Sequence, residues 1–158
     1  MNTLTAVLSV ASALSLGCAA ATGPQSLPDH TRFDRIRSAY VDIETTPTEA
    51  VLLRQLPLAL SKQGYFIIRT DPGVGGGYRF TTDWRVRPVH TDEVFEGVQQ
   101  ARTRLVVDAR LRGTSYNLAV YAVSYLEDAT GVWREAPPSN AMRKQLREMS
   151  TQFALDMR

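Results

Sequence analysis

Residues 78–87 constrain the fold more than any other part of this 158-residue chain. Apolar or small side chains alternate there with polar or charged ones: Tyr78, Phe80, Thr82, Trp84 and Val86 on one side, Arg79, Thr81, Asp83, Arg85 and Arg87 on the other. Alternation with a period of two is typical of a β-strand with one buried and one solvated face. Because the apolar side carries three aromatic rings, we expect helices to pack over it.

The first 21 residues indicate export, since they contain no charged side chain and hold an apolar run at residues 4–16. That run is too short to span a bilayer but suits a secretory signal. It ends in Ser15-Leu16-Gly17-Cys18, which resembles the lipobox of bacterial lipoproteins, where the cysteine is acylated and the preceding peptide removed. The alternative is a plain signal peptide cleaved at Ala19-Ala20-Ala21, which would leave a soluble periplasmic protein.

We therefore divide the chain into a signal peptide at residues 1–17, a flexible tether at 18–31 and a single domain at 32–158. Cys18 is the one cysteine of the sequence and cannot form an internal disulfide, which favours its acylation. Acyl chains would anchor the protein without a membrane-spanning helix. Ala19 follows Cys18 in place of the Asp that retains enteric lipoproteins in the inner membrane, so we expect the outer membrane.

The remaining pattern predicts an α+β fold, a two-layer sandwich in which an antiparallel meander of four to six strands carries two helices on one face. A capping box at residues 46–49 begins the first helix, which ends at Gly64. The second helix, residues 141–157, has one apolar stripe at helical spacing. The expected strands are residues 35–44, 65–70, 78–87, 102–112 and 116–126, with a possible edge strand at 132–134. Residues 88–101 are expected to form a long hairpin arm.

Composition and motifs argue against several functions. The formal net charge of +2 is too small to indicate a nucleic-acid partner. The glycine-rich turn at residues 71–77 precedes a strand and lacks the lysine of a phosphate-binding loop, so it predicts a hairpin. His30 and His90 have neither a nucleophile motif nor a set of metal ligands around them. We expect a non-catalytic protein with no cofactor and no metal.

The export signal, the tether, the capped helix and the Thr82-Asp83-Trp84-Arg85 strand together resemble the BamC-like lipoproteins, small helix-grip domains of outer-membrane assembly. The resemblance covers roughly residues 35–157. It implies an accessory or scaffold protein of the bacterial envelope, anchored in the outer membrane by lipid, facing the periplasm and bound to another envelope protein.

Two sets of residues are candidates for a binding site. An envelope partner or an anionic polymer would contact the charged strand face, with Arg79, Asp83, Arg85, Arg87, Arg104, Arg110 and Arg112 as the candidates. Alternatively, a cavity between sheet and helix would bind a lipid or another hydrophobic molecule, lined by Tyr78, Phe80, Trp84 and Leu56. A solvated strand face paired with Asp83 and Asp108 is the third interpretation.

Overall fold

The computed structural model describes residues 39–73 and 75–157. The predicted signal peptide, the tether, Cys18 and the start of the first predicted strand lie outside these residues. Within them the fold is α+β, as predicted, with seven strands and three helices. The order is β1 (Ala39–Ile43), α1 (Glu49–Lys62), β2 (Ile67–Pro72), β3 (Tyr78–Thr82), β4 (Arg85–Arg87), α2 (Thr91–Phe95), β5 (Val98–Arg112), β6 (Ser115–Asp128), β7 (Trp133–Ala136) and α3 (Asn140–Asp156).

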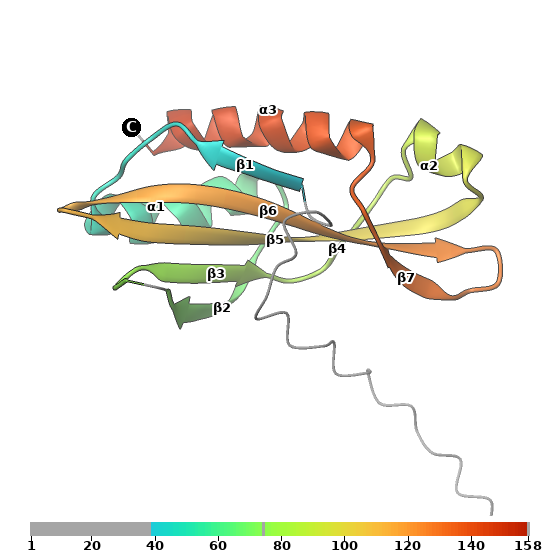
Figure 1. Cartoon of the computed structure of the whole chain (residues 1–158), viewed down its shortest axis with the longest axis horizontal. Coiled ribbons are helices and arrows are strands. Elements are labelled where there is room, and N and C mark those ends of the chain that lie inside the picture. Colours follow the sequence, from blue (N-terminus) through green and yellow to red (C-terminus); the bar gives the residue numbers. More distant parts are fainter. Residues whose placement is uncertain (1–38, 74, 158) are drawn as a thin grey trace, which may run out of the picture. The chain divides into compact units, whose positions relative to one another are not determined.

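One antiparallel sheet contains all seven of these strands. Five of them follow the order β1-β6-β5-β3-β2, while β4 pairs with β5 and β7 pairs with β6 outside this order. The long hairpin of β5 and β6 forms its centre (Figure 1). Near the hairpin turn, β1 pairs with β6 and β3 pairs with β5, whereas the far half of the hairpin pairs with the short strands β7 and β4. The apolar pattern on both faces of residues 116–126 predicts a central strand, and this is confirmed.

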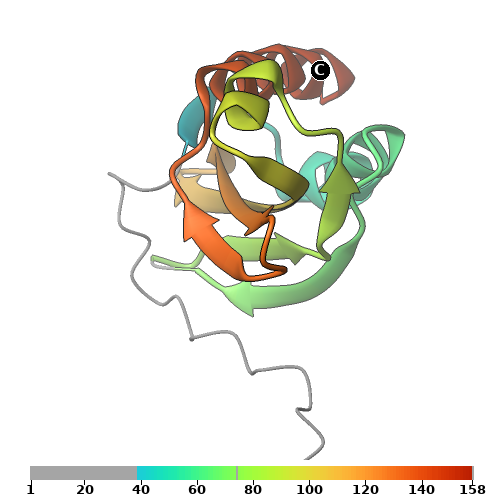
Figure 2. The same ribbon diagram turned by 90° about the vertical axis from the view of Figure 1, so that its right-hand side faces the viewer.

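The main hydrophobic core lies between one face of the sheet and the helices α1 and α3. Alternate residues of the central hairpin supply the sheet side of this core: Leu105, Val107, Ala109, Leu118, Val120 and Ala122. The stripe predicted for the last helix supplies the other side, with Met142, Leu146, Met149, Phe153 and Met157 all buried. Figure 2 shows, from the end of the domain, helices along one side of a strongly twisted sheet.

The glycine-rich turn forms the predicted hairpin between β2 and β3, and the Gly73 amide donates a 2.8 Å hydrogen bond to the Gly77 carbonyl. Position 77 requires glycine, because the backbone of Gly77 lies too close to the backbone of Ala109 to leave room for a side chain. A Cβ atom at this position would lie 2.0 Å from the carbonyl oxygen of Ala109 in β5. The turn therefore serves to bring β3 against the central hairpin.

The prediction of one continuous strand over residues 78–87 is wrong. β3 ends at Thr82 and β4 begins at Arg85, and both pair with β5. Four chain steps lead from Thr81 to Arg85, but their pairing partners in β5 move by only three, from Val106 to Thr103. One extra residue is thus inserted at Asp83-Trp84, which makes a β-bulge opposite Arg104.

The bulge has a local cause in side-chain hydrogen bonds. The amide of Leu105 donates to the Thr82 hydroxyl at 3.0 Å. The Asp83 carboxylate accepts the Trp84 amide at 2.7 Å, and the Asp83 amide donates to the Phe66 carbonyl at 2.8 Å. Side chains therefore satisfy backbone groups that a regular ladder would have paired.

Other boundaries also differ from the prediction. α1 begins at Glu49, because Thr48 is extended and bridges to Ser115 of β6. β2 begins two residues later than expected. Residues 88–101 are not a hairpin arm but contain α2 and the first four residues of β5, because the buried Glu93 holds this segment against the sheet.

Candidate functional site

Because the bulge inserts one residue, the residues that follow it lie on the opposite faces from those they would occupy in a regular strand. Arg85 and Arg87 pair with Thr103 and Ala101 and so lie on the face that the helices cover. Trp84 lies on the opposite face, where its ring contacts Tyr125 at a centroid distance of 5.1 Å. The prediction that Arg85 and Arg87 share a face with Arg79 is therefore wrong, as is the prediction that Trp84 packs beneath the helices.

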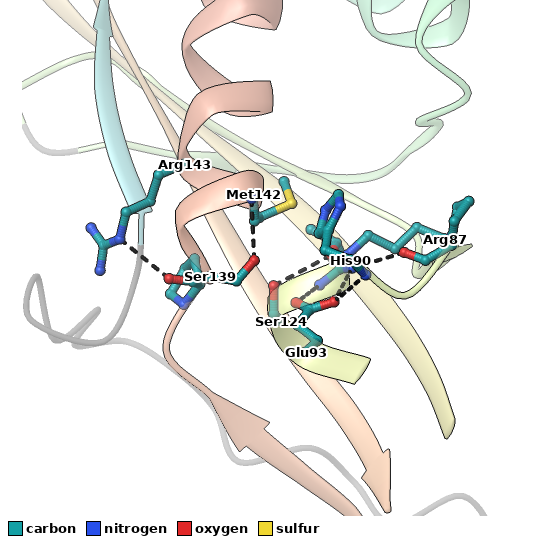
Figure 3. A network of polar contacts seen from close by, with 10 residues as sticks. Arg87, His90, Glu93, Ser124, Ser139, Met142 and Arg143 are labelled. Carbon is teal, nitrogen blue, oxygen red and sulfur yellow. Dashed lines mark hydrogen bonds and ion pairs between the residues drawn. The ribbon is translucent and has the colours of Figure 1, made fainter. Parts of the chain in front are cut away.

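Arg87 is 6% exposed and forms a bidentate ion pair with Glu93 of α2 (Figure 3). Its two terminal nitrogens donate to the carboxylate oxygens of Glu93 at 2.6 and 2.7 Å. Its Nε donates to the Thr103 hydroxyl at 2.9 Å, and one terminal nitrogen also donates to the Pro88 carbonyl at 3.0 Å. Four of the five N–H donors of the guanidinium are thus used within the domain, and the group joins α2 to β4 and β5.

Glu93 is stabilised as a carboxylate in this buried position. Burial alone would raise its pKa, but the Arg87 guanidinium and the His90 amide, which donates at 2.9 Å, together lower the pKa of Glu93 below its ordinary value. A buried pair with this geometry fixes the position of a short helix more than it offers a site for a ligand. We assign Arg87 and Glu93 a structural role.

Arg85 is also engaged on the helix side. One terminal nitrogen donates to the Gln63 carbonyl at 2.6 Å, and the guanidinium carbon lies 5.2 Å from the centre of the Tyr65 ring. Beside it is a half-open pocket of about 320 Å³, lined by Arg85, Arg87, Pro88, His90, Ala141, Lys144, Gln145 and Glu148. Two polar atoms of this lining, His90 Nε2 and Gln145 Oε1, are buried and have no hydrogen-bond partner among the described residues.

The opposite face of the sheet carries a cluster that we name the ring–arginine cluster, formed by Trp84, Arg102, Arg104, Tyr125 and Trp133. The Arg102 guanidinium lies 4.4 Å from the Trp133 ring centre, 5.1 Å from that of Trp84 and 5.4 Å from that of Tyr125. The Arg104 guanidinium lies 4.4 Å from the centre of the Trp84 ring. Cation–π contacts of this kind hold the side chains in fixed positions.

The ring–arginine cluster leaves hydrogen-bond donors unused. The Nε atoms of Arg102 and Arg104 and the Nε1 atom of Trp84 are buried, yet none has an acceptor among the described residues. Burial disfavours the charged guanidinium and lowers the pKa of Arg104, an effect that Asp83 opposes in part. The positive charge of the cluster is therefore only partly compensated.

The structure separates the other predicted partner-facing residues from this cluster. Arg79 pairs with the buried Asp108 carboxylate through two hydrogen bonds of 2.6 and 2.9 Å. Arg110 and Arg112 are exposed near the hairpin turn. Of the predicted partner-facing residues, Arg104 belongs to the ring–arginine cluster. The Asp83 carboxylate interacts with it electrostatically and favours its charged form.

The predicted cavity-lining residues do not share one location. Leu56 and Phe80 are 0% and 2% exposed within the packed core, and Tyr78 packs at the edge of that core, where its hydroxyl donates to Glu49. Trp84 is on the other face of the sheet. The sequence analysis missed Arg102, Tyr125 and Trp133, although Arg102 lies two residues from Arg104 and so had to share its face.

Two further findings concern the described part of the chain. No group of three or more His, Cys, Asp or Glu side chains there is arranged to hold a metal ion. In the same residues, no helix has the length and apolar character needed to cross a membrane. Compared with protein-family models and with curated proteins, the chain matches none.

Proposed function

We propose that this chain is a lipid-anchored protein of the bacterial cell envelope whose domain is a non-catalytic interaction module. In this proposal Cys18 is acylated, the domain faces the periplasm at the outer membrane, and the partner is another envelope protein. The BamC-like resemblance of the sequence supports the accessory or scaffold role.

The observation that carries the proposal is the difference between the two faces of the sheet. α1, α3 and the core cover one face. No described helix packs on the other, where the ring–arginine cluster lies beside a small buried apolar cluster of Val106, Ala119 and Tyr121. Trp, Tyr and Arg side chains gathered in this way are typical of protein interfaces.

Membrane attachment is tested by the variant Cys18→Ala in cells that express the full chain. We expect the wild-type protein in the membrane fraction and Cys18→Ala in the soluble fraction, because the acyl chains are its anchor. Ser26→Ala, a change in the same predicted tether, should leave the fractionation as in the wild type. Equal fractionation of wild type and Cys18→Ala would refute the anchor.

A second candidate function, binding of a small molecule, is favoured by the pocket beside α3. Its lining includes the unpartnered His90 Nε2 and Gln145 Oε1 and the charged Lys144 and Glu148, which suits a polar ligand better than a hydrophobic one. A native mass spectrum of protein purified from its own cells should show a bound small molecule if this candidate is correct.

A further inference from the structure

We infer that the ring–arginine cluster is the docking site for a carboxylate-rich segment of a protein partner. This inference rests on the proposed function, since it gives the chemistry of the partner that an interaction module would bind. Three observations carry it: the fixed orientation of two guanidinium groups, the unused donors of the cluster, and the apolar positions beside it.

The first observation is that the guanidinium groups are held in place before any partner binds. Arg102 lies among three rings from three different segments, those of Trp84, Tyr125 in β6 and Trp133 in β7. Arg104 lies over Trp84 as well. Because stacked side chains lose little conformational freedom on binding, such a site binds with a smaller entropic cost than flexible surface arginines.

The second observation is that the unused polar atoms of the cluster are all donors. Arg102 Nε, Arg104 Nε and Trp84 Nε1 can donate a hydrogen bond, and none of them can accept one. Among the described residues, the carboxylates that act on the cluster are Asp83, which raises the pKa of Arg104, and Glu135, which interacts with Tyr125. A ligand that supplies acceptors and negative charge would compensate the two guanidinium groups, and a carboxylate does both.

The third observation concerns apolar side chains at the margins. Val86 of β4 is 69% exposed on the face of the cluster, and Val132, next to Trp133, is 57% exposed. A site in which aromatic rings and arginines lie between exposed apolar residues fits a peptide segment with both acidic and apolar side chains. An anionic membrane surface is instead bound by flexible basic side chains that extend into solvent.

The two tryptophans of the chain, Trp84 and Trp133, both belong to the cluster. The intrinsic tryptophan fluorescence of the purified full chain therefore reports on this face alone. We would titrate the protein with a capped decaglutamate peptide and, as a control, with a capped decalysine peptide. We expect a saturable change in fluorescence with decaglutamate, which weakens as salt concentration rises, and no saturable change with decalysine.

Two matched double variants test whether Arg102 and Arg104 bind the peptide. Arg102→Gln combined with Arg104→Gln should weaken decaglutamate binding at least tenfold. Arg110→Gln combined with Arg112→Gln removes the same charge from exposed positions of the same strand and should change the affinity by less than twofold. Because the first pair could also disturb folding, circular dichroism accompanies each titration. Arg104→Lys, which keeps the charge but loses the planar fork, should weaken binding on its own.

Each contrary result overturns the inference. Absence of a saturable change with decaglutamate would do so, as would an equal loss of affinity in both double variants. Binding to phosphatidylglycerol vesicles without binding to decaglutamate would assign the face to lipid headgroups. A fluorescence change with protein concentration alone, unaffected by the peptide, would assign it to a second copy of the chain. None of these results bears on Cys18→Ala, so the inference can fail while the membrane anchor stands.

Discussion

Replacement of Glu93 by Gln should strongly destabilise the domain, although Glu93 is not part of the main hydrophobic core. The change removes the charge that compensates Arg87, whose side chain is 3% exposed in the ion pair. Breaking one partner of a buried pair leaves an uncompensated charge and costs about 3–5 kcal/mol. Since a domain of this size has a free energy of unfolding of about 5–15 kcal/mol, the loss is a large fraction of its stability.

The assay is equilibrium unfolding in guanidinium chloride, followed by tryptophan fluorescence. We expect the midpoint of Glu93→Gln to fall by about 1 M. Glu148→Gln makes the same chemical change in an exposed pair, where Lys144 Nζ lies 4.0 Å from the carboxylate, and should change stability by less than about 0.5 kcal/mol. Equal midpoints for these two variants would refute the claim that the buried pair holds α2 in place.

The effect of pH has a definite sign. The pKa of Glu93 is lowered on folding, so its ionisation stabilises the domain above its ordinary pKa of 4.5, and this contribution disappears as pH falls through the lower, folded pKa. The gap in stability between wild type and Glu93→Gln should therefore be largest at neutral pH and shrink in acid. The variant Arg87→Met with Glu93→Leu, which removes both charges, should be more stable than Glu93→Gln.

Two other variants test the local structure by the same unfolding assay. Gly77→Ala would place a Cβ atom 2.0 Å from the Ala109 carbonyl oxygen and should cost about 3 kcal/mol or more, whereas Gly75→Ala, at a φ of 72° with open space around it, should cost about 1–2 kcal/mol. Ser139→Ala removes the hydroxyl that accepts the Met142 amide at the start of α3 and should cost about 1 kcal/mol. Similar unfolding midpoints for Gly77→Ala and Gly75→Ala, or an unchanged midpoint for Ser139→Ala, would contradict these assignments.

Features of the fold that depend on local periodicity could be predicted from the sequence. The apolar stripe of α3 from Met142 to Met157 repeats at helical spacing, which predicts a helix with one buried face. The residues of β6 are apolar on both faces, which predicts a central strand. α2 has only five residues, too few to show a periodic signal. The pairing of Arg87 with Glu93 depends on how two loops approach the sheet, which spacing along the chain does not encode.

The bulge at Asp83-Trp84 had a weak signal that the alternation concealed. Asp is unfavourable inside a strand, and Thr and Asp side chains compete for backbone hydrogen bonds, which is what Thr82 and Asp83 do here. The alternation of residue types continues across the bulge, so it has the pattern of one regular strand. It could not show that the chain inserts a residue, because that depends on the partner strand, β5.

The same inserted residue explains both the buried ion pair and the proposed docking site. In a regular strand, Trp84 would lie beneath the helices with Phe80, and Arg87 would lie on the opposite face with Arg79. The bulge turns Arg87 inward, where Glu93 compensates its charge, and turns Trp84 outward, where its ring holds Arg102 and Arg104. The position of α2 and the chemistry of the sheet face opposite the helices are therefore two consequences of one change in strand register.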